Sequence, residues 1–153
     1  MKSIDAKTYL SILRQFIHDG KKVCVNISGS SMAPFLINHR DSVCLAAAHR
    51  PLIPGDIVFY QRDNGQFVLH RICKIKKNQY YLAGDAQTIL EGPIRENQIF
   101  ARVISICRKG QWFGPEDIRW LFFAVIWRRI LFFRPILLSI YTEYFLVKRR
   151  FAR

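Results

Sequence analysis

The chain has 153 residues, of which half are hydrophobic and 23% are charged. This composition excludes a wholly disordered or collagen-like protein, and the length allows one domain with a hydrophobic core and a short appendage. Lysine and arginine together number 24 against 11 acidic residues, which gives a formal net charge of +13. Such a charge predicts an anionic partner, either a nucleic acid or a lipid surface.

One helix and a series of short strands are predicted before residue 115. Leu10, Leu13, Phe16 and Ile17 recur at helical spacing within residues 5–19. Alternating and apolar runs, separated by turn residues, then predict strands at 23–27, 42–47, 56–61, 67–75, 79–83 and 99–107. Short strands without helices between them are typical of a mostly β, antiparallel fold such as a partly closed barrel.

The C-terminal tail combines positive charge with aromatic residues. Residues 116–153 hold 8 basic and 3 acidic side chains, together with 10 of the 21 Phe, Trp and Tyr residues. No charge-free stretch of the tail exceeds eight residues, whereas a membrane span needs about 20 apolar residues. We therefore expect helices, broken near Pro135, that lie in the interface of an anionic membrane. A helical hairpin packed on the β domain is the alternative, and nucleic acid is the less favoured partner.

These patterns divide the chain into an N-terminal amphipathic helix (1–22), a β domain (23–114) and a basic aromatic tail (115–153). The cysteines show neither Cys-x-x-Cys spacing nor histidines at zinc-finger distance. We expect them to be small buried thiols, which favours a reducing compartment, and we expect no metal and no cofactor. The four cysteines are Cys24, Cys44, Cys73 and Cys107.

A turn of small residues, Ser-Gly-Ser-Ser-Met-Ala-Pro at 28–34, could present a nucleophile. A predicted strand leads into it, and its small residues allow the backbone to turn closely around a substrate carbonyl. Met32 can pack beneath the turn while Ser31 points outward, exposed but rigidly held. The same composition is common in ordinary loops, so the turn alone does not establish a site.

His70 is the candidate base for that serine. Strand alternation places it on the face opposite Phe67 and Leu69, and an imidazole with an ordinary pKa near 6.5 suits proton transfer at neutral pH. Asp85, in a Gly-Asp pair that ends the next strand, could orient the imidazole, and so could Glu91. The alternatives are a half-buried histidine bonded to backbone and a turn aspartate that bonds its own backbone.

Four motifs in this order resemble a known family of peptidases: Ser-Gly-Ser-Ser-Met-x-Pro, Gly-Asp-Ile-Val, His-Arg-Ile and Leu-x-Gly-Asp. The resemblance covers about residues 5–110 and is to signal peptidase I and the LexA-type peptidases, the S24/S26 serine peptidase group. Because His70 stands where many relatives have a lysine base, the chain is most similar to the branch that includes archaeal and endoplasmic-reticulum signal peptidases. The resemblance implies that Ser31 is the nucleophile, that His70 is the general base, and that Asp85 ranks above Glu91 as the third group.

The resemblance also implies an oxyanion hole and a function. Gly29 stands where typical signal peptidases have a hydroxyl residue, so the hole would rely on the Ser31 backbone N–H with help from Ser28 or Ser30. The implied function is a serine endopeptidase that cleaves a precursor or signal-like peptide. From the basic aromatic tail we expect it to act at or near a membrane, as a peripheral or monotopic protein, with the cytoplasmic side favoured. The alternatives are a catalytically inactive relative that binds peptides or scaffolds a complex, and a LexA-like self-cleaving regulator.

Overall fold

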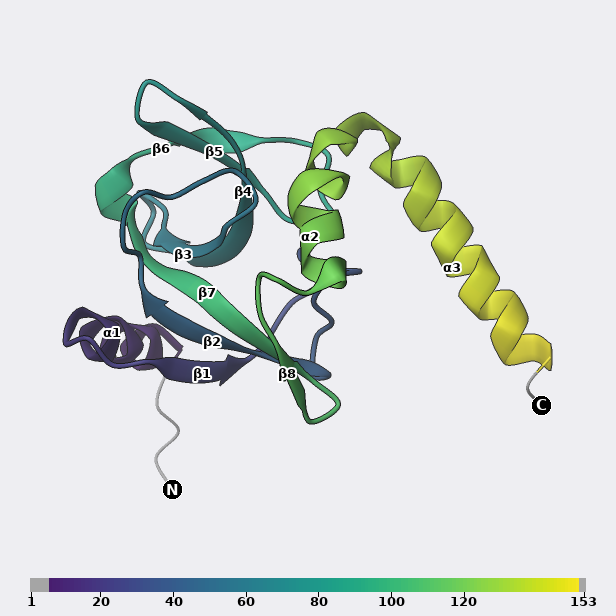
Figure 1. The fold of residues 1–153 in the computed structure, drawn as a ribbon, viewed down its shortest axis with the longest axis horizontal. Coiled ribbons are helices and arrows are strands. Elements are labelled where there is room, and N and C mark those ends of the chain that lie inside the picture. Colours follow the sequence, from purple (N-terminus) through teal and green to yellow (C-terminus); the bar gives the residue numbers. More distant parts are fainter. Residues whose placement is uncertain (1–5, 152–153) are drawn as a thin grey trace.

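The computed structural model describes residues 6–151, with side chains described for residues 8–144. Eight strands form one antiparallel sheet in the order β1-β2-β7-β3-β4-β5-β6, and β8 pairs with β7. The sheet is strongly curved but not fully closed (Figure 1). The strands are β1 (Val23–Asn26), β2 (Asp41–Ala47), β3 (Ile57–Gln61), β4 (Phe67–Lys76), β5 (Gln79–Ala83), β6 (Glu91–Ile94), β7 (Ile99–Arg108) and β8 (Gln111–Phe113).

The mostly β, partly open fold with flanking helices is confirmed. Helix α1 (Ala6–His18) matches the predicted helix and buries Leu13 and Ile17 against the sheet. All six predicted strands are present within a few residues of their expected bounds. The short strands β6 and β8 were not predicted, and β6 contains a Gly-Pro pair that normally signals a turn. Proline is tolerated there because β6 is an edge strand, where one side needs no backbone donor.

Side chains from β4 divide between two hydrophobic clusters, one on each face of the strand. Phe67 and Leu69 pack against a cluster that includes Met32 and Phe59. Val68 and Ile72 belong to the other cluster, together with Tyr60 and Leu82. The predicted alternation along this strand is therefore confirmed, and it fixes the face on which His70 lies.

The C-terminal segment forms helices that bend at the predicted break. It comprises α2 (Ile118–Val125), the 3-10 turns η2 (Trp127–Arg129) and η3 (Leu131–Phe133), and α3 (Arg134–Phe151). Asp117 caps α2 by accepting a hydrogen bond from the Arg119 backbone N–H, and Pro135 occupies the first turn of α3, where proline is tolerated. Figure 1 shows α2 beside the sheet and α3 leading away from it. Within the part of the chain that is described, no helix is both long and apolar enough to cross a membrane.

The structure corrects the expectation that all four cysteines are buried thiols. Cys24 and Cys44 form a disulfide, and Cys24 is exposed. The pairing of β1 with β2 places these two residues directly opposite each other, with 4.1 Å between their Cα atoms. Only the strand register reveals this proximity, because 20 positions separate the two cysteines in the chain. Cys73 and Cys107 are free, and the disulfide removes the support that the cysteines gave to a reducing compartment.

Candidate active site

Ser31 and His70 line the same cavity of about 270 Å³. Ser31 follows β1 in a tight turn, closed by hydrogen bonds from Ala33 N–H to the Ser30 carbonyl (3.1 Å) and from Leu36 N–H to the Met32 carbonyl (2.8 Å). Met32 is buried beneath the turn, whereas Ser31 is partly exposed, as the sequence predicted. The fold thus brings the predicted nucleophile and the predicted base to one solvent-accessible hollow.

The backbone conformation explains why position 29 is a glycine and not a hydroxyl residue. Its φ is +93°, in the left-handed region that side chains with a Cβ rarely adopt. A serine or threonine at this position would strain the turn, and Ser28 lines the cavity instead. Ser30 is exposed but does not line the cavity. Of the two predicted helpers of the oxyanion hole, only Ser28 is therefore placed at the site.

The loop that follows β5 holds the backbone of Ser31 in place. Ala86 N–H donates to the Ser31 carbonyl over 2.9 Å. Gly84 packs so closely that an added Cβ would lie 2.9 Å from the carbonyl carbon and 3.0 Å from the Cβ of Ser31. The Gly84 N–H is itself bound by the side-chain oxygen of Gln87, at 2.9 Å. Residues 84–87, the bracing loop, therefore fix the position from which Ser31 would attack.

Substituting Gly84→Ala is expected to displace Ser31 and to slow its reaction with a serine-directed acylating probe by about 10-fold or more, because small misplacements of reacting groups are costly. The readout is the labelling rate, followed by intact mass, with thermal unfolding measured in parallel. Gly114→Ala is the matched control, because its new Cβ would meet only the movable carboxylate of Glu116. Equal labelling rates in both variants would contradict the bracing role.

His70 is buried and is contacted by two polar side chains. The Tyr60 hydroxyl lies 3.2 Å from its Nδ1, and Glu91 Oε2 lies 3.8 Å from the same nitrogen. Strand register explains the first contact: His70 is opposite Val58, and Tyr60 lies two residues further along the same face of β3. Arg62 anchors Glu91 with two hydrogen bonds of 2.6 and 2.5 Å.

Burial holds His70 in its neutral form. Loss of solvation is the main cause that lowers the pKa of His70 to about 4; the Glu91 carboxylate opposes this shift, and the Arg62 cation adds to it. Hydrogen bonding to Arg62 keeps the pKa of Glu91 below its ordinary value. Burial and Glu91 raise the pKa of Tyr60. At neutral pH the site therefore holds a neutral imidazole, a neutral phenol and an ionised carboxylate.

These protonation states favour one tautomer of His70. The ionised Glu91 carboxylate, whose Oε2 lies 3.8 Å from Nδ1 of His70, can only accept hydrogen bonds, so it favours a proton on that nitrogen. The Tyr60 hydroxyl oxygen, 3.2 Å from Nδ1, can accept a hydrogen bond from this N–H. In this tautomer the lone pair lies on Nε2, which is the form of imidazole that can remove a proton.

Asp85 lies in a different ion pair from the one that the sequence suggested. Its carboxylate receives two hydrogen bonds from Arg71, of 2.9 and 2.7 Å, and both side chains are fully buried. Arg71 also donates to the Gly55 carbonyl at 2.9 Å. The fold therefore places Glu91 beside His70 and Asp85 beside Arg71. The sequence analysis had instead ranked Asp85 above Glu91 as the group that orients His70.

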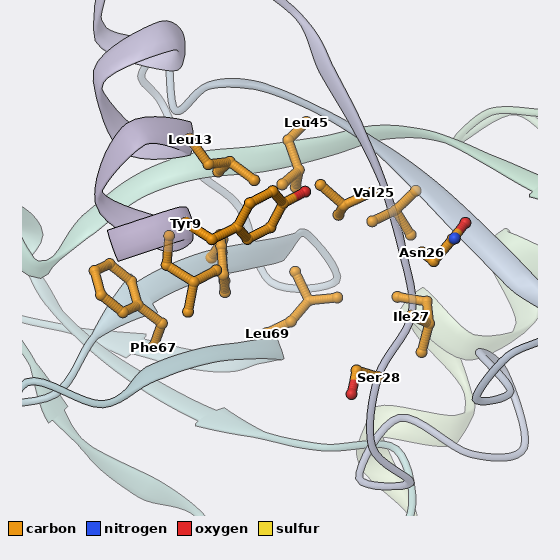
Figure 2. Close-up of a pocket in the computed structure, with 12 residues that line it drawn as sticks. Tyr9, Leu13, Val25, Asn26, Ile27, Ser28, Leu45, Phe67 and Leu69 are labelled. Atoms are coloured by element: carbon orange, nitrogen blue, oxygen red, sulfur yellow. The ribbon is translucent and has the colours of Figure 1, made fainter. Parts of the chain in front are cut away.

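An apolar groove adjoins the cavity on the side of α1 (Figure 2). Its volume is about 390 Å³. Figure 2 shows side chains from α1, β1 and β4 converging on this space, with Ser28 at one end. The groove and the cavity share Ile27, Ser28, Phe67 and Leu69. The two hollows therefore lie side by side across these residues, and together they are called the trough.

Comparison with known proteins identifies a peptidase family. The family model described as Peptidase S24-like matches residues 2–104. The chain belongs to the Peptidase S24-like family. Membership indicates a serine-type peptidase fold, and the matched region contains Ser31, His70 and Glu91. No curated protein matches the chain.

Beyond the S24-like region, the C-terminal segment contributes two buried side chains to the bracing loop. Trp127 Nε1–H donates to the Asp85 carbonyl at 2.8 Å. Arg134 donates to the carbonyls of Gly84 and Gln87 at 2.8 and 2.7 Å. The Arg134 guanidinium is fully buried, and burial lowers its pKa. Sequence reasoning missed this role, because it treated the arginines of the tail as lipid-facing charges.

Proposed function

We propose that this S24-like protein is a serine endopeptidase in which Ser31 is the nucleophile and His70 is the general base. The observation that carries the proposal is the shared cavity, which is lined by both a partly exposed serine and a buried, neutral imidazole. Glu91 and Tyr60 take the orienting role, because they contact Nδ1 of His70. Asp85 is assigned a structural role through Arg71.

The reaction follows from these positions. Nε2 of His70 removes the proton of the Ser31 hydroxyl as its oxygen attacks the peptide carbonyl. The Ser31 N–H and the Ser28 hydroxyl are the proposed donors to the oxyanion that forms. His70 then protonates the leaving amine as the C–N bond breaks, and water hydrolyses the acyl-enzyme by the reverse proton path.

The substrate is proposed to bind as an extended strand along the open edge of β1. Ile27 N–H donates to the Asp41 carbonyl across to β2. The alternate residues Asn26 and Ser28 therefore direct their backbone groups away from β2, toward the trough. A peptide paired there would place apolar side chains in the groove of Figure 2.

The resemblance to the His-base branch of the signal peptidases supports a precursor or signal-like peptide as the substrate. A strand-binding edge next to an apolar groove suits such a peptide, whose recognition elements are backbone and apolar side chains.

A serine-directed acylating probe tests the mechanism. We expect one adduct on Ser31, seen by intact mass, and a loss of about 10³-fold or more in labelling rate for Ser31→Ala and His70→Ala. Ser30→Ala is the control, since Ser30 adjoins the nucleophile but lies outside the cavity. Absence of labelling in the parent protein would indicate an inactive peptide-binding relative. A mass loss during incubation without a substrate would indicate self-cleavage.

A further inference from the structure

Large apolar side chains of the C-terminal segment face solvent at the corner between α2 and α3. Phe132 is 89% exposed, Phe133 63% and Ile136 61%. Exposed apolar residues continue along both helices, including Leu121, Val125, Ile126, Leu137 and Ile140. Large apolar side chains exposed in such number are a common feature of interaction surfaces.

We propose that this corner, defined as Arg129, Phe132, Phe133 and Ile136, docks on an anionic lipid bilayer, with α3 lying along the bilayer surface. The inference goes beyond the peptidase reaction, and it rests on the proposed function only in placing the substrate near a membrane. Aromatic and aliphatic side chains beside arginine are the pattern of a segment that lies in a lipid interface.

The spacing of residues along α3 fits an interfacial helix. Ile136, Ile140 and Tyr144 follow one another at intervals of four, and so do Leu137 and Tyr141. All five are exposed. Ser139 and Thr142 fall on the other side of the helix, where each donates to a carbonyl of its own turn. One side of α3 can therefore enter the apolar layer while the other remains in water.

Charge favours an anionic lipid as the occupant. Arg129 is exposed at the corner, and the sequence of α3 ends with Lys148, Arg149 and Arg150. Between residues 118 and 144 the only acidic residue is Glu143. Basic groups near an anionic leaflet gain electrostatic attraction, and long arginine side chains reach headgroups while their stems stay in the apolar layer.

Three other arginines of the segment bind groups within the protein and do not belong to the docking corner. Arg119 is paired with Asp117 at 2.8 Å, Arg128 donates to the carbonyls of Ala124 and Cys73, and Arg134 is buried against the bracing loop. Arg134 directly follows Phe133 and donates hydrogen bonds to the loop that holds Ser31, so this one residue links the docking corner to the loop. Docking would thus hold the active site at a fixed position relative to the bilayer.

Flotation of the full chain with phosphatidylcholine vesicles that contain 30% phosphatidylserine tests the proposal. We expect the parent protein to float with these vesicles and about 10-fold less protein to float with pure phosphatidylcholine. The double variant Phe132→Ser/Phe133→Ser should lose most of its flotation, because both side chains are exposed and their removal leaves the core intact. Arg129→Gln should weaken flotation less. Thermal unfolding should match the parent protein in both variants.

A matched pair on α1 provides the control, Ile12→Ser/Phe16→Ser, whose side chains are also exposed. Helix α1 lies on the opposite side of the molecule from α3 (Figure 1). Retained flotation of this pair supports the proposal. Loss of flotation in the α1 pair alone, or equal flotation with neutral vesicles, would overturn it, as would self-association through the corner without lipid binding. Ser31→Ala should float like the parent protein, which separates this result from the test of the peptidase.

Discussion

Replacing Asp85 by alanine is expected to lower the free energy of unfolding by about 3–5 kcal/mol, because it leaves the Arg71 cation buried without its carboxylate partner. Both side chains have no exposed surface, and two hydrogen bonds join them. The other contacts of Arg71, with the Gly55 carbonyl and with the Phe35 ring 4.8 Å away, carry no net charge to offset the guanidinium. Urea denaturation with the linear extrapolation measures the change.

Two further variants test whether the loss of stability comes from the buried Arg71 cation that has no carboxylate partner. Arg71→Met/Asp85→Leu removes both charges and should recover a large part of the lost stability, because apolar replacements of a buried pair are often tolerated. Asp56→Ala is the matched control, since Asp56 also follows a glycine but is partly exposed and accepts a hydrogen bond from the Ile53 N–H. It should cost about 1 kcal/mol. An Asp85→Ala protein as stable as the parent would contradict the structural role of the pair.

The difference between Asp85 and Glu91 shows how far sequence reasoning reaches. Local patterns were sufficient for α1, for the six predicted strands and for the two faces of β4, because each depends on periodicity within one segment. The identity of the carboxylate beside His70 depends instead on β6. This short edge strand contains a Gly-Pro pair, which in the sequence indicates a turn and not a strand. Glu91 is the first residue of that strand and lies opposite Leu82 of β5.

Some of the missed contacts had a usable signal in the sequence. The predicted strands at 56–61 and 67–75 are joined by an Asp-Asn-Gly turn, and pairing them as a hairpin places Tyr60 near His70. The contacts of Trp127 and Arg134 with the bracing loop had no such signal. More than 40 positions separate them from the loop carbonyls that they bind, and nothing local distinguishes Arg134 from the exposed Arg129. The disulfide likewise depended on the pairing of β1 with β2.

Acidification is expected to destabilise the protein through His70. Its pKa is about 4 in the folded chain and near 6.5 when the imidazole is exposed on unfolding. Between these two values the unfolded state binds more protons than the folded state, so the free energy of unfolding falls as the pH is lowered from 6.5 to 4. The full shift in the pKa of His70 corresponds to a loss of about 3 kcal/mol in the free energy of unfolding. Urea denaturation at pH 7, 6, 5 and 4.5 measures how the free energy of unfolding changes with pH.

The variant His70→Gln isolates this contribution, because glutamine does not titrate and can still hydrogen-bond Tyr60. Its stability should change less with pH between 6.5 and 4.5 than that of the parent protein. Protonation of Glu91 reduces the free energy of unfolding only at a lower pH than this range, because the pKa of Glu91 lies below its ordinary value of 4.5. The labelling rate of Ser31 should follow the folded-state pKa instead, staying constant from pH 7 to about 5 and falling toward pH 4 as the base becomes protonated. A rate that falls with a midpoint near 6.5 would show that the imidazole is open to solvent when it reacts, which would remove the basis for a buried, pre-oriented base.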